Sequence, residues 1–379
     1  MFIFHSFILL ILLSLLVLLI LNTLTVNRTS VHKTPESFPL VSVLVPARNE
    51  EENIERCINS LCKQSYSNYE LIVYDDRSAD RTVDVLEQLS QKFSNLKIIK
   101  GQELPKGWLG KCFACHQLAK EASGEFYLFT DADTEHNKDS VQASIAEIQH
   151  KNVGLLSLLP SVQRKSFWEK LFMPLLYFVE YTFLPFFLIR KLKNPKLSMG
   201  NGQFMLFSRK AYEAIGGHES VKDKLVEDVS LARKIKKHGL GLEIQDGFNL
   251  VNCRMYRNFK EIVEGFTKNI FPGLGYSVVG LIFLISFCFL IYIYPYIALT
   301  LGFVFSLDPV NWIYLPLIQV SVALMMRFIL AYRFSLGWLS CFLHLPAISL
   351  FILIALNSSR MFLFGPGASW KGRRYPKTI

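Results

Sequence analysis

The first residues place the strongest constraint on this chain, because residues 2–26 are almost uninterrupted Leu, Ile and Phe. A helix of this length can cross the roughly 30 Å hydrocarbon core of a bilayer. A cleaved signal peptide needs a basic start and a small-residue exit, whereas residues 1–5 contain no Lys or Arg and the segment ends in LNTLTV. We therefore expect an uncleaved anchor. Arg28, His32 and Lys33 follow it, so its C-terminal end is expected in the cytoplasm.

The C-terminal part of the chain predicts three further membrane helices, at residues 276–305, 312–332 and 336–357. The loop SLDPVN has no Lys or Arg and is expected outside the cell. Residues 166–192 are also apolar, but Glu180 and two prolines favour a helix in the membrane interface. Three full spans would place the basic tail outside, against the positive-inside tendency. We expect a cytoplasmic tail, with residues 336–357 re-entrant.

Composition indicates that a water-soluble part accompanies these helices. The chain is 51% hydrophobic and 19% charged, which is too apolar for a soluble enzyme and too charged for membrane helices alone. Its formal net charge of +10 suits a surface beside anionic lipid head groups. No basic run interleaved with aromatic residues occurs outside the membrane flanks, so a nucleic-acid partner is not expected.

The stretch that begins at Val41 has the pattern of an α/β domain. Five short apolar runs, VSVLVP, ELIVYD, LKIIK, FYLFTD and VGLLSLL, are typical of buried strands. Amphipathic stretches beginning near Glu51, Asp80, Lys111 and Lys138 separate them. This alternation predicts right-handed βαβ units in a doubly wound sheet. Ligands of such sheets bind beyond the carboxyl ends of the strands, where PARNE, DDRSAD and TDADT fall.

Acidic residues gather at these strand ends and in one later pair. A lone D-x-D is usually a solvated turn, and an isolated Asp76 could cap a helix or accept hydrogen bonds from a base or ribose. Paired carboxylates on a strand-end turn bind a divalent cation through oxygen, and the cation binds phosphate. Taken together, the set favours this functional interpretation. The acidic residues are Asp75, Asp76, Asp131, Asp133, Glu227 and Asp228.

Four stretches, VSVLVPARNEEENIERCINSL, YELIVYDDRSADRT, FTDADT and VEDVSLARKIKKHG, together resemble the family 2 nucleotide-sugar glycosyltransferases with the GT-A fold. The resemblance covers residues 41–257. GWLGKCFACHQLA, GNGQFMLFSRKAYEAIGGHE, RMYRNF and SWKGRRY are similar to the bacterial 4,4'-diaponeurosporenoate glycosyltransferases of carotenoid synthesis. Ceramide and hopanoid-associated types share parts of the pattern. Ceramide-type and processive relatives carry (Q/R)-x-x-R-W, but Asn258 stands where Trp is expected, which argues against a long polysaccharide product.

The resemblance implies roles for individual residues. Asp133 would be the direct metal ligand, with Asp131 contacting both metal and nucleotide sugar, and Asp228 would be the catalytic base for an alcohol acceptor. A carboxylic acid acceptor is already ionised near pH 7, so Asp228 would then orient it. The implied residues are Pro46, Arg48, Glu50 and Asp76 for the uridine site, Asp131 and Asp133 for Mg²⁺ or Mn²⁺, and Glu227 and Asp228 for catalysis.

Basic residues would offset the charge of the diphosphate. Lys111 follows a turn with two glycines, which would deliver its ammonium toward the leaving nucleotide. Arg254, Arg257, Trp370 and Lys371 are candidates for contacts with the acceptor or the diphosphate. The two arginines fit membrane-interface anchoring equally well, and Trp370 fits an interfacial aromatic belt.

The heptapeptide KCFACHQ contains the C-x-x-C-H pattern of c-type haem attachment. Such haem is attached outside the cytoplasm, whereas a nucleotide-sugar domain must reach a cytoplasmic donor, so no haem is expected. We expect Cys112, Cys115 and His116 to start a helix and pack. The seven cysteines form no regular framework, which also argues against disulfides and a zinc site.

The sequence therefore predicts an α/β protein whose GT-A catalytic domain, a Rossmann-like doubly wound mixed sheet, faces the cytoplasm from a multi-pass membrane part. It would transfer a sugar, glucose by resemblance, from a UDP-sugar to a lipid, by resemblance the carboxylate of a C30 carotenoid acid. Ceramide, diacylglycerol, a hopanoid, polyprenyl phosphate and a non-catalytic nucleotide-binding role are the alternatives. The expected parts are an anchor (1–26), a linker (27–40), the GT-A domain (41–257, with the interface helix 166–192), an interfacial segment (258–275), membrane helices (276–358) and a basic tail (359–379).

Overall fold

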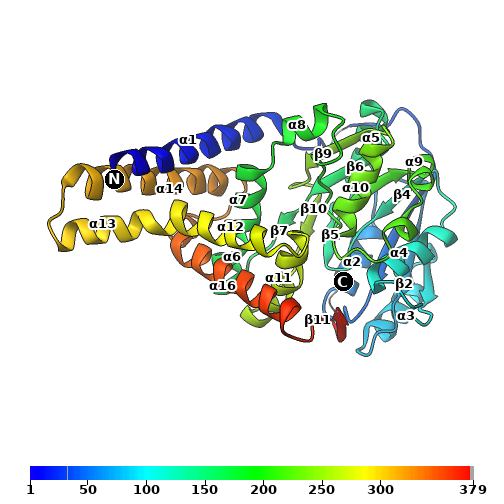
Figure 1. Cartoon of the computed structure of the whole chain (residues 1–379). Helices are drawn as coiled ribbons and strands as arrows, with labels where there is room; N and C mark the ends of the chain where they lie inside the picture. The colour runs from blue at the N-terminus through cyan, green and yellow to red at the C-terminus, as the bar shows by residue number, and fades with distance from the viewer. Residues whose placement is uncertain (32, 376–379) are drawn as a thin grey trace. The chain divides into compact units, whose positions relative to one another are not determined.

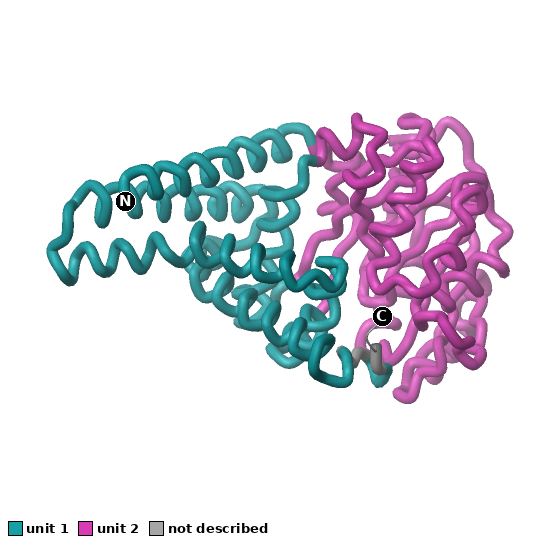
Figure 2. The backbone as a smooth tube through the Cα atoms, in the orientation of Figure 1, with its two compact units in different colours: residues 1–25, 164–185, 256–379 teal, residues 26–163, 186–255 magenta. Residues whose placement is uncertain are grey.

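The computed structural model describes residues 1–31 and 33–375, which form two compact units (Figure 2). Unit 1 comprises Met1–Thr25, Arg164–Pro185 and the described part of Tyr256–Ile379. Unit 2 comprises Val26–Gln163 and Phe186–Met255. Each unit is therefore assembled from separate stretches of the chain.

Unit 2 contains a seven-stranded sheet with the order β3-β2-β1-β4-β8-β6-β9. Neighbouring strands are parallel except at β8, which is antiparallel to both β4 and β6. The five apolar runs predicted as strands are β1, β2, β3, β4 and β6, and the mixed α/β class is confirmed. The strands are β1 (Val41–Ala47), β2 (Tyr69–Asp75), β3 (Leu96–Lys100), β4 (Phe126–Phe129), β6 (Leu155–Leu159), β8 (Met205–Ser208) and β9 (Leu242–Asp246).

The centre of this sheet is apolar on both faces, which is why its strands read as continuous hydrophobic runs. In β1 every residue except Pro46 is buried. β1 pairs with β2 from Val41 opposite Tyr69 to Ala47 opposite Asp75, so these two strands end at the same edge. The helices of unit 2 are α2 (Ile54–Leu61), α3 (Thr82–Lys92), α4 (Gly110–Glu121), α5 (Ser140–Lys151), α8 (Phe186–Lys191), α9 (Arg209–Ala214), η1 (His218–Val221) and α10 (Glu227–Lys237).

A small three-stranded sheet stands at the edge where these strands end. Its order is β5-β10-β7, formed by β5 (Thr134–His136), β10 (Val251–Cys253) and β7 (Ser161–Val162). β10 is antiparallel to β5 and pairs Cys253 with Thr134. The D-x-D turn lies between β4 and β5, so both sheets fix its two ends.

Unit 1 contains four helical segments that are long and apolar enough to cross a membrane. They are Phe2–Thr25 (α1), Val278–Val304, Val310–Arg333 and His344–Leu363 (α16). The second segment consists of α12 (Val278–Cys288), η2 (Phe289–Ile293) and α13 (Tyr294–Val304), and the third consists of η3 (Val310–Tyr314) and α14 (Leu315–Arg333). Within the unit, α1 lies beside α14 and α7 (Figure 1). Its remaining elements are α6 (Phe167–Phe172), α7 (Pro174–Phe183), α11 (Phe259–Gly273), α15 (Leu339–Phe342), β11 (Ala368–Trp370) and β12 (Arg373–Tyr375).

Two segments differ from the expected helix boundaries, and proline and the left-handed region explain both. Residues 166–192 form α6, α7 and α8 rather than one helix, because Pro185 separates the last two and Pro174 begins α7. The last candidate span begins at His344, not at residue 336. Ser335 and Gly337 have positive φ angles of 50° and 80° and break the chain there, whereas a proline is tolerated in the first turn of α16.

Candidate active site

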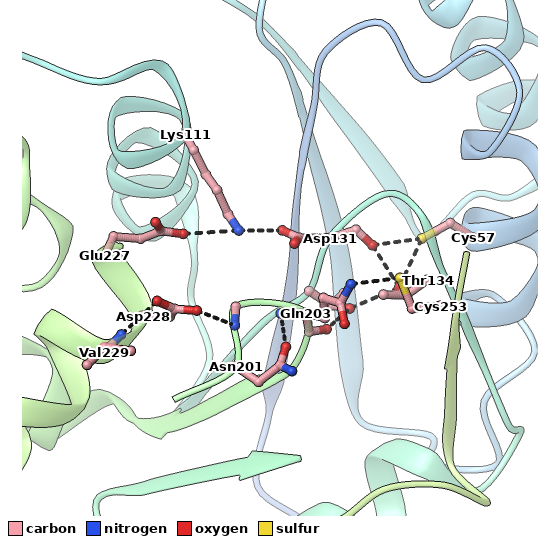
Figure 3. A network of polar contacts seen from close by, with 12 residues as sticks. Cys57, Lys111, Asp131, Thr134, Asn201, Gln203, Glu227, Asp228, Val229 and Cys253 are labelled. Carbon is pink, nitrogen blue, oxygen red and sulfur yellow. Dashed lines mark hydrogen bonds and ion pairs between the residues drawn. The ribbon is translucent and has the colours of Figure 1, made fainter. Parts of the chain in front are cut away.

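Three predicted site residues meet in a single ionic network in unit 2 (Figure 3). The Nζ atom of Lys111 lies 2.7 Å from Oδ1 of Asp131 and 3.0 Å from Oε1 of Glu227. Lys111 comes from the first turn of α4, Asp131 follows β4 and Glu227 begins α10. The lysine therefore joins the D-x-D turn to the E-D pair, which are almost a hundred positions apart in the sequence.

The turn before α4 fixes where Lys111 enters the site. The backbone N–H of Leu109 donates to the carbonyl of Lys222 at 2.8 Å. The Trp108 ring packs against the rings of Phe113 and His116, with centroid distances of 5.5 Å and 4.9 Å. These contacts hold the residues before α4 against the first two turns of that helix. The GWLGK stretch thus positions its lysine by packing as well as by the flexibility of glycine.

The D-x-D turn is held through its backbone, which leaves its carboxylates for other partners. The Asp131 carbonyl accepts hydrogen bonds from the N–H of Thr134 at 3.2 Å and from its hydroxyl at 2.7 Å. The thiol of Cys57 also donates to it at 3.8 Å. The carbonyl of Asp133 accepts from the backbone N–H of Arg254 at 3.2 Å. Arg254, a candidate contact residue, is thereby placed next to the turn through its main chain.

Asp228 lies one residue after Glu227, at the N-terminus of α10. Its Oδ2 accepts a hydrogen bond from the backbone N–H of Gly202 at 3.0 Å, and its Oδ1 accepts from the N–H of Val229 at 2.7 Å (Figure 3). A helix N-terminus presents unpaired N–H groups and favours negative charge. The local sequence therefore provides a suitable position for both carboxylates of the pair.

The two carboxylates of this pair have opposite electrostatic environments. Burial and the neighbouring Glu227 charge raise the pKa of Asp228 to about 7, although the Lys111 ammonium acts against them. Burial also opposes ionisation of Glu227, but its direct ion pair with Lys111 holds the pKa of Glu227 below the usual value. Burial would lower the pKa of Lys111, but Asp131 and Glu227 raise it well above the ordinary value. Lys111 and Glu227 are thus charged near neutral pH, while Asp228 can exchange a proton.

Gly202 is a site residue that motif reading did not identify. A Cβ atom at this position would lie 2.9 Å from Lys111 Nζ and 3.5 Å from carboxylate oxygens of both Asp228 and Glu227. Only glycine leaves this space open while its N–H contacts Asp228. The sequence GNGQ could have indicated this role, since a glycine between polar residues is typical of a close backbone approach.

Buried groups beneath the D-x-D turn were also missed. The amide nitrogen of Gln203 donates to Sγ of Cys253 at 2.7 Å, and the hydroxyl of Thr130 donates to the Gln203 carbonyl at 2.8 Å. His218 is buried beside Tyr212, and burial lowers the pKa of His218 to about 3, so its ring is neutral. No local pattern in the sequence marks Gln203, because its contacts with Thr130 and Cys253 join distant segments of the chain.

The residues expected at the uridine site lie at the ends of β1 and β2. Arg48 donates through Nη1 to the carbonyls of Asp76 and Arg77. The backbone N–H of Glu50 donates to the Thr82 hydroxyl at 2.8 Å. Asp76 is only 4% exposed, and its N–H donates to the carbonyl of Ala47. Arg48 therefore ties the first strand end to the second.

A small pocket opens at the Lys111 network. Pro46, at the end of β1, is the uridine-site candidate that lines it. The lining residues are Pro46, Lys111, Cys115, Phe129, Thr130, Asp131, Gly202, Met205, His218 and Glu227.

Three of the candidate acceptor contacts belong to unit 1. The N–H of Arg257 donates to Oε2 of Glu261 at 2.8 Å, at the start of α11. Trp370 ends β11, which packs against α11, and Lys371 forms the turn to β12 with a φ of 47°. Their expected role remains a prediction.

Both cysteines of the C-x-x-C-H pattern are buried in α4, each 1% exposed. The thiol of Cys112 donates to the carbonyls of Val221 and Lys224 at 3.5 Å and 3.6 Å. Burial raises the pKa of both thiols. We expect replacement of Cys112 and Cys115 by Ala to retain most transfer activity, to lower the melting temperature by several degrees through lost packing, and to leave visible absorbance unchanged. A Soret band in the wild type that disappears in the double variant would contradict this.

Comparison with known proteins identifies the domain. Residues 42–216 match the family described as Glycosyl transferase family 2. This part of the chain is similar to a family 2 glycosyl transferase domain. A 4,4'-diaponeurosporenoate glycosyltransferase of Staphylococcus haemolyticus is 26% identical over 345 residues, 90% of this chain and 89% of its own. A protein of the same name from Staphylococcus aureus is 27% identical over 343 residues, 88% of each chain.

A solved structure extends the comparison to the fold. The mannosyltransferase PcManGT from Pyrobaculum calidifontis, in complex with GDP-Man and Mn²⁺, has a TM-score of 0.52 and 16% sequence identity. The match covers 94% of this chain and 98% of that one. The predicted GT-A fold and the resemblance to family 2 glycosyltransferases are confirmed, and the chain is a glycosyltransferase.

Proposed function

We propose that this glycosyltransferase transfers glucose from UDP-glucose, with inversion, to the carboxylate of a C30 carotenoid acid, 4,4'-diaponeurosporenoate. The observation that carries the proposal is the Lys111 network, in which one strand-end carboxylate, one helix-start carboxylate and one ammonium meet beside a pocket. The similarity to curated relatives of that name over about nine-tenths of the chain supports the choice of acceptor.

The residues of this network match a divalent cation, Mg²⁺ or Mn²⁺. Asp131 already binds one cation, the ammonium of Lys111, so its carboxylate is placed and ionised to accept positive charge. Among the described residues no three His, Cys, Asp or Glu side chains converge into a ready metal site. Mg²⁺ commonly takes one or two carboxylates and completes its shell with phosphate oxygens and water. Asp131 and Asp133 would hold the cation, which would neutralise charge on the diphosphate.

In the proposed reaction an acceptor oxygen forms a bond to the anomeric carbon of glucose, and the bond from that carbon to the UDP oxygen breaks. The electron pair leaves with UDP. The side chain of Lys111 is 36% exposed, so its ammonium can offset the negative charge on the leaving UDP. Asp228 would orient a carboxylate acceptor in its protonated form, or remove the proton of an alcohol acceptor in its ionised form.

We also propose the topology that the sequence indicates. The four apolar helices would make a multi-pass protein of the cell membrane, with residues 41–257 as the cytoplasmic catalytic domain and residues 166–192 at the membrane interface. The basic tail is proposed to be cytoplasmic, with the last apolar segment re-entrant rather than spanning, and the last residues of the tail lie outside those described. No nucleic acid and no haem take part.

Product analysis tests the proposed acceptor. Membranes containing the protein are supplied with labelled UDP-glucose and, in separate reactions, diaponeurosporenoate, ceramide, diacylglycerol and polyprenyl phosphate. We expect a labelled lipid only with the carotenoid acid, and mild alkali should release glucose from it because an acyl glucose is an ester. An alkali-stable product, or transfer only to another acceptor, would contradict the proposal.

Lys111 and a divalent cation would compete for Asp131, which leads to a prediction about metal affinity. Without donor, Lys111→Met should bind Mn²⁺ about tenfold more tightly than the wild type, because the competing ammonium is lost from two carboxylates. Free Mn²⁺ measured by electron paramagnetic resonance reports the affinity. Lys106→Met, in the exposed part of the same loop, is the matched control and should change nothing. Equal Mn²⁺ affinities in the wild type and both variants would show that Lys111 does not compete with the metal for Asp131.

A further inference from the structure

The helices of unit 1 contain a group of buried polar side chains that the proposed reaction does not use. Arg327 in α14, Tyr292 in η2 (Phe289–Ile293) and His344 in α16 are 2%, 1% and 0% exposed. They surround one ring, that of Phe178 in α7. Cζ of Arg327 lies 5.7 Å from its centroid, and the Tyr292 and His344 ring centroids lie at 5.5 Å and 5.1 Å. We call Arg327, Tyr292 and His344 the Arg327 cluster.

Most of the hydrogen-bonding capacity of the Arg327 cluster is unused within the part of the chain that the structure describes. Nη2 of Arg327 donates to the carbonyl of Ser340 at 2.8 Å, but Nη1 has no partner. The hydroxyl of Tyr292 and both ring nitrogens of His344 have no partner either. Buried polar groups are hydrogen-bonded in the great majority of cases, so three incomplete neighbours around one ring require an explanation.

The same unit pairs some of its other buried polar side chains with backbone carbonyls. The amide of Asn22 in α1, 0% exposed, donates to the carbonyls of Tyr181 and Leu184 at 2.9 Å and 2.7 Å. The amide of Gln319 in α14 donates to the carbonyl of His5 at 2.8 Å. Among the described residues, Nε2 of His5 and Oδ1 of Asn311 also lack a partner, but each is a single atom, whereas the Arg327 cluster has four such atoms around one ring.

The positive charge of Arg327 also requires a partner. Arg327 lies six positions before the end of the apolar segment Val310–Arg333, which corresponds to about 9 Å along the helix. No Asp or Glu among the described residues acts on its charge. A guanidinium within an apolar span is costly and normally pairs with an anion, a carbonyl or water. Its one carbonyl contact leaves the positive charge of Arg327 without a counter-ion from the described residues.

We infer that the Arg327 cluster binds the carboxylate of a lipid-soluble amphiphile. Arg327 supplies the positive charge, and Nη1, the Tyr292 hydroxyl and the His344 ring supply donors for two carboxylate oxygens. Hydrogen bonds from these donors to a carboxylate are stronger where water is excluded. The position inside an apolar span favours a carboxylate over a phospholipid phosphate, which belongs to the head-group layer.

An aromatic row provides a surface for the apolar tail of this amphiphile. The Phe287 ring lies 6.3 Å from that of Tyr292, and the Phe183 ring lies 5.6 Å from that of Phe287. Phe183 is 38% exposed, so the row leads from the buried cluster to the surface of the unit. The inference rests on the proposed function and deepens it, because the proposed acceptor is a long polyene with a carboxylate. The cluster would hold that carboxylate before transfer, and the carboxylate would leave the cluster to react.

Binding of cis-parinaric acid, a fluorescent polyene carboxylate, to the purified full chain tests the site without any sugar donor. We expect saturable energy transfer from tryptophan to the polyene, competed by palmitate but not by hexadecanol or phosphatidylglycerol. Arg327→Gln should weaken binding at least about tenfold, and Tyr292→Phe a few-fold, because each removes a donor to the carboxylate. Tyr314→Phe, at an exposed tyrosine of η3 (Val310–Tyr314), is the matched control and should bind as the wild type does.

Equal competition by hexadecanol, competition by phosphatidylglycerol, or unchanged binding in both cluster variants would overturn the inference. If Arg327→Gln does not fold, the wild-type comparison of palmitate with hexadecanol and the Tyr292→Phe titration decide it. Binding without transfer to a carotenoid acid would contradict the proposed function alone, whereas transfer without cluster-dependent binding would contradict this inference alone.

Discussion

We expect Asp228→Asn to lower the turnover number by about 10²–10⁴-fold with an alcohol acceptor, because the variant removes a general base. With a carboxylate acceptor the loss should fall near the lower end, since the acceptor needs no deprotonation. Donor affinity should change little, because Lys111 and Glu227 keep their ion pair. Steady-state kinetics and a separate measurement of UDP binding distinguish these effects.

The raised pKa of Asp228 predicts a pH dependence of both rate and stability. With an alcohol acceptor, wild-type turnover should fall below about pH 7, where this carboxyl becomes protonated. Between about pH 4 and pH 7 the folded protein keeps a proton that the unfolded chain releases. The free energy of unfolding therefore falls as pH rises through this window. Asp228→Asn should remove that fall, measured by melting at pH 5 and pH 8.

Asp223→Asn is the matched control for this experiment. Asp223 is an exposed carboxylate five residues before Asp228, and it forms an ion pair with its neighbour Lys224. Its replacement should leave turnover and the pH profile as in the wild type. An Asp228→Asn variant with a changed KM and an unchanged turnover number would exclude Asp228 from the chemistry.

We expect Asp133→Asn to reduce metal-dependent transfer by about 10²–10³-fold, because it weakens the electrostatic stabilisation of the leaving diphosphate. The turn should keep its shape, since the backbone carbonyl of Asp133 makes the contact with Arg254. The readouts are transfer as a function of Mn²⁺ concentration and Mn²⁺ affinity without acceptor.

The control for Asp133→Asn is Asp84→Asn, which removes an exposed carboxylate from α3. It should retain wild-type turnover and Mn²⁺ dependence. If Asp133→Asn turns over normally and still requires the metal, the D-x-D turn has been assigned the wrong role. Unchanged melting temperatures in both variants would show that any loss is local.

The sheet was predictable because its central strands are buried on both faces and end in polar residues. Runs such as VSVLVP need no distant information, since the five consecutive residues Val41 to Val45 are all buried. Strand β8 was not predicted individually, and its antiparallel direction depends on the chain returning through residues 186–204 rather than on local pattern.

The acidic residues were predictable individually, but their arrangement was not. The sequence marks Asp131 and Asp228 through strand-end and helix-start positions. The sequence does not indicate that Lys111 forms ion pairs with Asp131 and Glu227, and it suggested only that the lysine would bind a diphosphate. That geometry follows from the packing of α4 and α10 on distant strands. Gly202 illustrates the same limit, because its small size matters only beside Lys111.

The discontinuous composition of unit 1 has a consequence for biosynthesis. The first helix, α1, packs against α14, and Gln319 contacts the backbone of His5 across 314 positions of sequence. Translation proceeds at about 5–20 residues per second, so roughly 15–60 s separate the emergence of these two partners from the ribosome. As a membrane helix, α1 would spend that interval without α14, and the backbone of His5 would lack its contact with Gln319. Membrane chaperones that bind polar residues of early helices would therefore be needed for the longest time by α1, the first helix of this chain.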